Sequence, residues 1–340
     1  MPDGQTVLLA VTIAVALGFD FTNGFHDTAN AVATTISTRA LGAKLAIGLS
    51  ALLNLVGAVV AIQFLHTKVA NTIGGLVAPS GGVSLGLIIV ALAAAILWNL
   101  LTWRAGLPSS SSHALIGALI GMGIAGYGFG AVNWDKVVPV LVGLATSPFF
   151  GFVLGYLFLL AVLHAFRNMT PSRGNSRFRV AQVFRGGFVS FSHGANDAQK
   201  TMAIITLALL ATGHLSSPHG VFPSPPLWVV AVAAGAIGLG TYAGGWRIIK
   251  TMGSRITRLE PVDGFAAQTM AAVVIQAATQ FSIPVSTTHV VSGSVMGAGA
   301  TRRLAAVRWG TARSIVLAWL LTIPATALLA ACGSLVVRAI

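Results

Sequence analysis

The sequence has little charge, and most of the charge it has is positive. Lys and Arg number 20 and Asp and Glu 7 among 340 residues, so that 8% are charged. An ordinary soluble domain carries about 25%. A soluble fold of this size could not cover its surface with so few charged side chains. The composition therefore excludes a soluble globular enzyme and a disordered chain, and it predicts a protein that crosses a lipid bilayer several times.

Cysteine is almost absent. The single Cys332 excludes an internal disulfide and a cysteine metal cluster. We expect no cofactor and no fixed structural metal site. The net charge of +13 does not indicate a nucleic-acid partner, because the basic residues do not form a stripe on a soluble module.

The basic residues lie in short clusters between apolar runs. Of the 20, five fall within 167–185, four within 247–258 and four within 302–313. This distribution is typical of cytoplasmic loops under the positive-inside rule. The segment 213–226 has no Lys or Arg and is expected outside the cell. We therefore predict a multi-pass protein of the cell (inner) membrane, with a cytoplasmic central loop and both termini external.

Long apolar runs such as 46–65 and 86–101 are continuous rather than alternating, which indicates helices rather than strands. The fold class is all-α, with about 10–12 helical segments. Segments such as 25–38 and 181–193 are shorter than the roughly 20 residues that span a bilayer. We interpret them as halves of broken helices or as re-entrant hairpins, which exist at membrane depth only where they line a protein-enclosed cavity.

Two motifs each occur twice, in the same order and at nearly the same spacing. They are Phe21-Thr-Asn-Gly-Phe-His-Asp27 with Phe191-Ser-His-Gly-Ala-Asn-Asp197, and Pro108-Ser-Ser-Ser-Ser-His113 with Pro284-Val-Ser-Thr-Thr-His289. We divide the chain into a first repeat (1–166), a basic linker (167–181) and a second repeat (182–340). The distribution of basic residues indicates that equivalent segments of the two repeats cross the membrane in opposite directions. Inverted repeats with interrupted helices are typical of secondary transporters, whose site lies near the midplane.

Two of the seven acidic residues, Asp27 and Asp197, lie inside apolar segments and are repeat mates. An ionisable group in the membrane costs at least ~2.5 kcal/mol, so it needs a partner or a function. The symmetric pair favours a functional site over a structural one. For Asp20 the sequence allows two interpretations: a solvated position near a membrane entrance, or a functional role.

Amides and hydroxyls surround this pair. The amides Asn23, Asn30, Asn196 and Gln199 could coordinate a small cation, bind an oxyanion, or form interhelical hydrogen bonds. Hydroxyl runs follow the prolines and open apolar helices: Ser110, Ser111, Ser112, and Ser286, Thr287, Thr288. Helix N-termini of this kind bind anions, although hydroxyls can also simply cap their own helix. Two such N-termini facing each other would hold a tetrahedral oxyanion.

An anion next to Asp27 and Asp197 would be repelled unless cations lie between them. The pattern therefore predicts an anion carried together with a cation, either H⁺ or Na⁺. Asp27, Asp197, Asn23, Asn196 and His26 are the candidate cation residues. His193, His113 and His289 are proton relays or structural hydrogen-bonding groups. Lys200, the single basic residue near the motifs, is interpreted as snorkelling or pairing locally.

The motifs Gly24-Phe-His-Asp-Thr-Ala-Asn30 and Gly194-Ala-Asn-Asp-Ala-Gln-Lys200 resemble the duplicated signature of the PiT inorganic phosphate transporters, especially the bacterial low-affinity type. The resemblance covers residues 10 to 300. It implies symport of phosphate with a cation, as free phosphate or as a metal–phosphate complex. It assigns Asp27, Asn30, Asp197 and Gln199, with the two hydroxyl runs, to the phosphate and cation sites. His26 stands where many members have Asn, which favours H⁺ over Na⁺.

Three other functions are weighed against this one. A carrier of another oxyanion such as sulfate would use the same groups. An anion channel would need no cation. An intramembrane hydrolase is disfavoured, because Ser112 and His113 are adjacent and cannot face each other on a helix. The sequence leaves open whether the chain works alone or as a homodimer.

Overall fold

The computed structural model describes residues 3–64, 68–77, 82–217, 222–281, 283 and 285–339. Pro284 of the second hydroxyl motif, and part of the segment 213–226, lie outside the described residues. The helices are α1 (Gly4–Ser37), α2 (Ala43–Phe64), α3 (Lys68–Gly74), α4 (Leu85–Ala105), α5 (Ser111–Tyr127), α6 (Trp134–Ala165), α7 (Pro171–Ala211), α8 (Leu227–Ala243), α9 (Trp246–Lys250), α10 (Pro261–Gln280), α11 (Thr287–Arg302) and α12 (Trp309–Ala339), with short helical turns η1 (Phe129–Ala131), η3 (Thr251–Arg255) and η4 (Leu304–Ala306). Extended pairing in the described part of the chain is limited to an isolated bridge between Val77 and Val132. The all-α prediction is confirmed.

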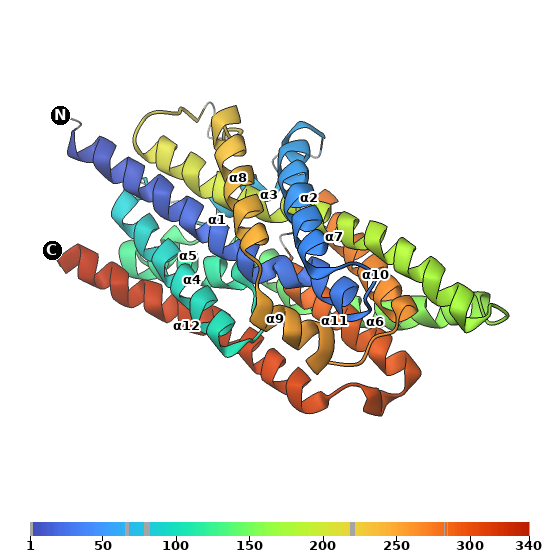
Figure 1. Ribbon diagram of the computed structural model, residues 1–340. Helices are drawn as coiled ribbons and strands as arrows, with labels where there is room; N and C mark the ends of the chain where they lie inside the picture. The colour runs from blue at the N-terminus through green and yellow to red at the C-terminus, as the bar shows by residue number, and fades with distance from the viewer. Residues whose placement is uncertain are drawn as a thin grey trace.

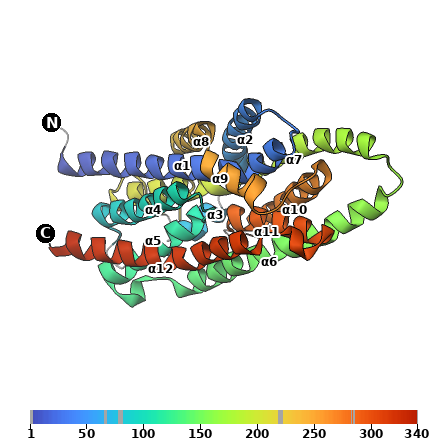
Figure 2. The ribbon, with the colours of Figure 1, turned by 60° about the horizontal axis from the view of Figure 1, so that its bottom comes forward.

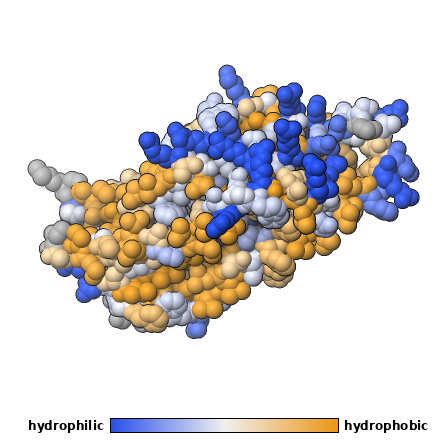
Figure 3. Space-filling model, turned by 90° about the horizontal axis from the view of Figure 1, so that it is seen from below, coloured by the Kyte–Doolittle hydropathy of each residue, from blue (hydrophilic) through white to orange (hydrophobic). Residues whose placement is uncertain are grey.

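Several helices are suited to a bilayer. Five of them, α1, α2, α4, α6 and α12, are long and apolar enough to cross a membrane, and α8 with α9–η3 adds a sixth if this pair, bent by 58°, is one span. Figure 3 shows the hydrophilic residues gathered along one side of the molecule, beside a broad hydrophobic surface. In Figures 1 and 2 the two termini lie at the same end, and the turn between α6 and α7 lies at the opposite end. The chain is a multi-pass membrane protein.

The first motif does not interrupt its helices, contrary to the sequence-based interpretation. The segments 6–23 and 25–38 are parts of the continuous α1, and 181–193 and 196–212 are parts of the continuous α7. The glycines instead allow close packing. A Cβ at Gly24 would meet the carbonyl oxygen of Ile237 in α8, and one at Gly194 would meet that of Asn54 in α2. Small residues at such crossings are typical of packed membrane helices.

The hydroxyl motifs do begin short helices inside the protein. Helices α5 and α11 have 17 and 16 residues, and their first turns are buried. The side chains of Ser110 and Ser286 accept hydrogen bonds, each of 3.1 Å, from the backbone N–H groups of His113 and His289. These bonds satisfy N–H groups that the helix leaves without a partner. The predicted N-caps are confirmed.

The two halves of the chain interlock through matching helix pairs. Helix α1 packs on α8 and α2 packs on α7, while α5 packs on α12 and α6 packs on α11. Close approaches repeat as well. A Cβ at Gly121 of α5 would meet the carbonyl oxygen of Ala327 in α12, and one at Gly297 of α11 would meet that of Phe152 in α6. Gly121 and Gly297 are equivalent positions, since each lies eight residues after the histidine that ends its hydroxyl motif.

The buried apolar residues form two clusters, and α1 and α7 pass from one to the other in opposite order. Along α1, Phe19 belongs to the first cluster and Ala29 to the second. Along α7, Val189 belongs to the second and Ala198 to the first. Asp27 and Asp197 lie at these junctions. The fold thus places the two carboxylates between its two apolar cores.

The close approach at Gly297 provides a test of this packing. We expect Gly297→Ala to lower stability by about 1–3 kcal/mol, because the added methyl group must displace the α6 backbone. Thermal unfolding of the purified protein in detergent, followed by size-exclusion chromatography, measures the change. Gly310→Ala is the matched control, since nothing lies within 4 Å of a Cβ there. Equal stability of the two variants would contradict the predicted contact.

Candidate functional site

The structure brings the two repeated aspartates together around one histidine. Asp27 of α1, Asp197 of α7 and His193 of α7 are buried, and one potential ligand atom from each lies within 4.8 Å of the others. His193 Nε2 lies 3.6 Å from Asp27 Oδ2 and 3.4 Å from Asp197 Oδ2. The Asp27 and Asp197 side chains are 2% and 0% exposed. This conformation is closed around the carboxylates.

Hydroxyl groups from both short helices contact the Asp27 carboxylate. Ser111 Oγ in the first turn of α5 lies 3.1 Å from its Oδ2, and Thr288 in the first turn of α11 donates to its Oδ1 at 3.1 Å. His26 Nδ1 lies 2.9 Å from the same Oδ1. The other ring nitrogen of His26 faces Thr102 Oγ1 at 3.2 Å. Two helix N-termini therefore converge on one carboxylate, as expected for an anion site with the carboxylate at its edge.

The amides of α1 bind the same hydroxyl motifs. Asn30 Nδ2 donates to Thr288 Oγ1 at 3.0 Å and to Thr287 Oγ1 at 3.3 Å. Asn23 Oδ1 accepts from Ser111 Oγ at 2.6 Å. Asn23 Nδ2 and Asn30 Oδ1 are buried and have no hydrogen-bond partner among the described residues. The cluster therefore has one free hydrogen-bond donor and one free acceptor with which a polar ligand could bond.

Lys200 differs most from expectation. Its side chain is fully buried and does not snorkel to a membrane surface. Its Nζ lies 2.8 Å from Asp197 Oδ1 and 2.5 Å from Ser112 Oγ, so the predicted local pairing is correct. Lys200 is the repeat mate of Asn30, and Ser112 is that of Thr288. Equivalent positions thus make equivalent contacts, but the second repeat places a basic amine where the first has an amide.

A hydrogen-bonded chain from α8 orients His193. Thr241 Oγ1 donates to the carbonyl oxygen of Ile237 at 2.8 Å, so it accepts from Asn54 Nδ2, also at 2.8 Å. Asn54 Oδ1 therefore faces His193 Nδ1 at 2.8 Å and can only accept. It follows from this network that Nδ1 carries a proton. A neutral His193 would then direct the lone pair of Nε2 at two carboxylates.

The sequence did not point to Asn54 or Thr241, and it left His193 open between a proton relay and a structural hydrogen-bonding group. The available signal was weak: single polar residues inside the apolar segments 45–65 and 227–246, which commonly mark interhelical hydrogen bonds. No repeated motif contains Asn54 or Thr241, so symmetry could not single them out.

Some predicted residues lie apart from the cluster. The side-chain amide of Gln199 forms hydrogen bonds with backbone groups. Its Oε1 accepts from Val69 N at 3.1 Å, and its Nε2 donates to Ala195 O at 2.9 Å. Asn196 Nδ2 donates to Thr279 Oγ1 at 2.8 Å. Asp20, in contrast, interacts with Asn23, Asp197 and Lys200 of the cluster, and it is 0% exposed, which excludes its solvated alternative.

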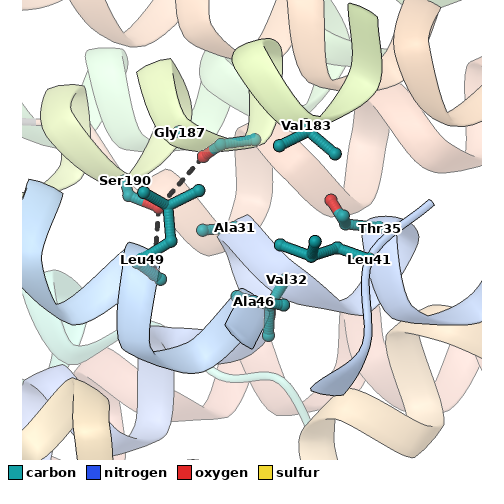
Figure 4. Close-up of a pocket in the computed structure, with 11 residues that line it drawn as sticks. Ala31, Val32, Thr35, Leu41, Ala46, Leu49, Val183, Gly187 and Ser190 are labelled. Atoms are coloured by element: carbon teal, nitrogen blue, oxygen red, sulfur yellow. Dashed lines mark hydrogen bonds between the residues drawn. The ribbon is translucent and has the colours of Figure 1, made fainter. Parts of the chain in front are cut away.

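A small cavity lies beside the site, between the end of α1, α2 and α7 (Figure 4). Its volume of about 10 Å³ is room for about one water molecule. Ser190 Oγ donates a hydrogen bond of 2.9 Å to Ser50 Oγ in the lining of the cavity. The cavity is too small for a tetrahedral oxyanion.

Comparison with known proteins identifies the family of the chain. The model of the phosphate transporter family matches residues 23–330. The chain belongs to this family. It is 47% identical over 324 residues to a protein of Rhizobium meliloti (strain 1021) and 43% identical over 328 residues to one of Bacillus subtilis (strain 168). Both are named probable low-affinity inorganic phosphate transporter, and the matches cover 95% and 96% of both chains, respectively.

A solved structure supports the fold. The chain matches "The sodium-dependent phosphate transporter" with a TM-score of 0.82 and 23% identity, over 98% of this chain and 100% of that one. The resemblance found in the duplicated motifs is confirmed. This family member is a transporter and not an enzyme, so the intramembrane hydrolase alternative is wrong.

Proposed function

We propose that this family member imports inorganic phosphate together with a cation by alternating access. The observation that carries the proposal is the convergence of the α5 and α11 N-termini, through Ser111 and Thr288, on the buried Asp27. The relatives' names support phosphate as the substrate. Ser112, Thr287 and Asn30 complete the proposed phosphate site, while Ser110 and Ser286 hold the two helix ends in place.

A buried carboxylate in an anion site favours phosphate over sulfate. A protonated phosphate can donate a hydrogen bond to Asp27 or Asp197, whereas sulfate has no proton to donate. Uptake of labelled phosphate into proteoliposomes tests this assignment. Excess unlabelled phosphate should compete and excess sulfate should not. Equal competition by sulfate would overturn phosphate selectivity, and uptake that follows voltage alone would favour the channel alternative.

We infer that residues 1–166 and 182–340 act as two inverted repeats in the cell membrane, with the basic residues of 167–185, most of them in the first turns of α7 rather than in a loop, on the cytoplasmic side. The exchange of helix partners between the halves and the opposite order of the cores along α1 and α7 support this arrangement. Sites at a repeat interface open to either side when one repeat rocks against the other. Because the carboxylates are closed off in this conformation, either opening requires such a movement.

The coupling cation in this proposal is a proton on His193. With Nδ1 donating to Asn54, a second proton on Nε2 would lie between Asp27 and Asp197 and would favour both ionised carboxylates. Imidazole nitrogen is a poor ligand for Na⁺, since hard cations select oxygen ligands. Lys200 already supplies a fixed positive charge to Asp197. These features support H⁺ over Na⁺.

The charges also bear on the form in which phosphate travels. With His193 protonated and Lys200 charged, the two carboxylates are balanced before phosphate binds. Lys200 is the single Lys or Arg side chain in the described contacts of this cluster. A bound phosphate therefore needs further neutralisation, which additional protons or a divalent metal bound to phosphate would provide.

His193→Gln tests the coupling role. We expect this variant to lose uptake driven by a pH gradient while it retains exchange of labelled for unlabelled phosphate, because glutamine can accept no proton. Uptake and exchange in the same proteoliposomes measure the two steps. His164→Gln, on an exposed turn of α6, is the matched control. Normal pH-driven uptake by His193→Gln would overturn the proposed proton site.

A further inference from the structure

A large groove opens on the hydrophobic surface between α6 and α12. Its volume is about 770 Å³, and α11 and α5 form its inner wall. Its lining is mainly apolar and includes Leu144, Phe149, Phe152, Val316, Leu320 and Ile323. Phe149 and Leu320 are 64% and 67% exposed, which places them at an open rim. In a bilayer, an exposed apolar rim of this kind contacts lipid.

Among the described residues that line the groove, the charged side chain lies at one end. Arg313 and Trp309, near the start of α12, line that end, and Ile323 lines the other. The ten helical steps from Arg313 to Ile323 span roughly 15 Å, which is half the thickness of a ~30 Å hydrocarbon core. The dimensions match one lipid leaflet.

Charge favours an anionic occupant. Among the described residues that line the groove none is acidic, and Arg313 continues the basic cluster that includes Arg302, Arg303 and Arg308. We propose that the groove binds an anionic phospholipid, with its phosphate at Arg313 and one acyl chain along the apolar wall. The occupied leaflet is the cytoplasmic one, in keeping with the expected position of the basic cluster.

The inner wall connects this lipid site to the transport site. Trp319 stacks on His289 with ring centroids 4.0 Å apart, and His289 lies 4.3 Å from His113. These histidines belong to the first turns of α11 and α5, the same turns that direct Thr288 and Ser111 at Asp27. An acyl chain against Trp319 therefore supports the arrangement of both helix N-termini, and anionic lipid is expected to raise the rate of uptake.

Fluorescence quenching tests the proposal. The protein is reconstituted in phosphatidylcholine vesicles containing increasing fractions of phosphatidylglycerol brominated in the middle of its acyl chains. The difference between wild type and Trp319→Phe isolates the signal of Trp319. We expect saturable quenching of Trp319 at low fractions of the brominated lipid. Arg313→Gln should raise the half-saturating fraction about fivefold, since a basic residue near the headgroup contributes about 1 kcal/mol.

Two controls separate this proposal from its rivals. Arg303→Gln removes one charge from the same cluster outside the groove and should leave quenching unchanged. Brominated phosphatidylcholine should quench Trp319 less at every fraction. Equal quenching by the two lipids, or no quenching of Trp319, would overturn the proposal. So would disulfide crosslinking between copies through Leu320→Cys in a Cys332→Ser background, because the groove would then hold a second copy. Failure of phosphate uptake itself would leave the quenching result unaffected.

Discussion

Phosphate uptake by Asp27→Asn is expected to fall to the level of protein-free liposomes while the variant still inserts and folds. Asparagine keeps the shape of the side chain and one oxygen for Ser111 or Thr288. It removes the charge that faces His193 and His26. The transport cycle then lacks a carboxylate that the proposed proton on His193 faces, so the rate of uptake should drop at least roughly 100-fold, which corresponds to about 3 kcal/mol in the activation barrier.

The control for this variant is Asp135→Asn, which changes an exposed aspartate in the first turn of α6. Its uptake should match that of wild type. The measurement is the initial rate of labelled phosphate uptake, normalised to the amount of monodisperse protein recovered from the liposomes. Wild-type uptake by Asp27→Asn would remove Asp27 from the transport cycle.

Asp197→Asn is expected to lose both uptake and stability, which distinguishes it from Asp27→Asn. The substitution leaves the Lys200 ammonium group buried without its carboxylate, and breaking a buried ion pair in this way costs about 3–5 kcal/mol. Removing both charges in Asp197→Asn with Lys200→Met should restore stability, because no unpaired charge remains. It should not restore uptake.

Thermal unfolding of the single and double variants in detergent measures this difference, with uptake assayed in parallel. A double variant no more stable than Asp197→Asn would contradict the ion pair. Recovery of uptake in the double variant would show that neither group takes part in transport.

The duplicated motifs made the aspartate pair and the hydroxyl runs predictable. A polar residue that recurs at one place in both halves of an apolar sequence stands out against its surroundings. The start of short helices at Ser110 and Ser286 could be predicted for the same reason, since capping is a local property of the sequence. The direction of these helices toward Asp27 followed from assuming that repeat mates face each other.

The unpredicted features are those that break the repeat or depend on packing. Lys200 occupies the position in the second motif that Asn30 occupies in the first. Because the residue type changes between the two motifs, symmetry did not predict that the Lys200 side chain is buried. The orientation of His193 depends on Asn54 and Thr241, which come from two other helices and join no motif. The continuity of α1 and α7 was also missed. Gly24 and Gly194 suggest helix breaks in isolation, and only the backbones of α8 and α2 packed against them show that they serve close contact.

The solved relative leaves the coupling ion of this chain open, because 23% identity establishes the fold alone. The assignment of the ion depends instead on the positive groups that this chain places at its two carboxylates, Lys200 at Asp197 and the second proton of His193 between Asp27 and Asp197.

The most direct test of the central claim is phosphate uptake in proteoliposomes under separately imposed pH and Na⁺ gradients. The proposed proton site predicts concentrative uptake when the outside is acidic, with Na⁺ absent, and no stimulation by an inward Na⁺ gradient at equal pH. Uptake that requires Na⁺ and ignores the pH gradient would contradict the assignment of His193 as the group that carries the coupling proton.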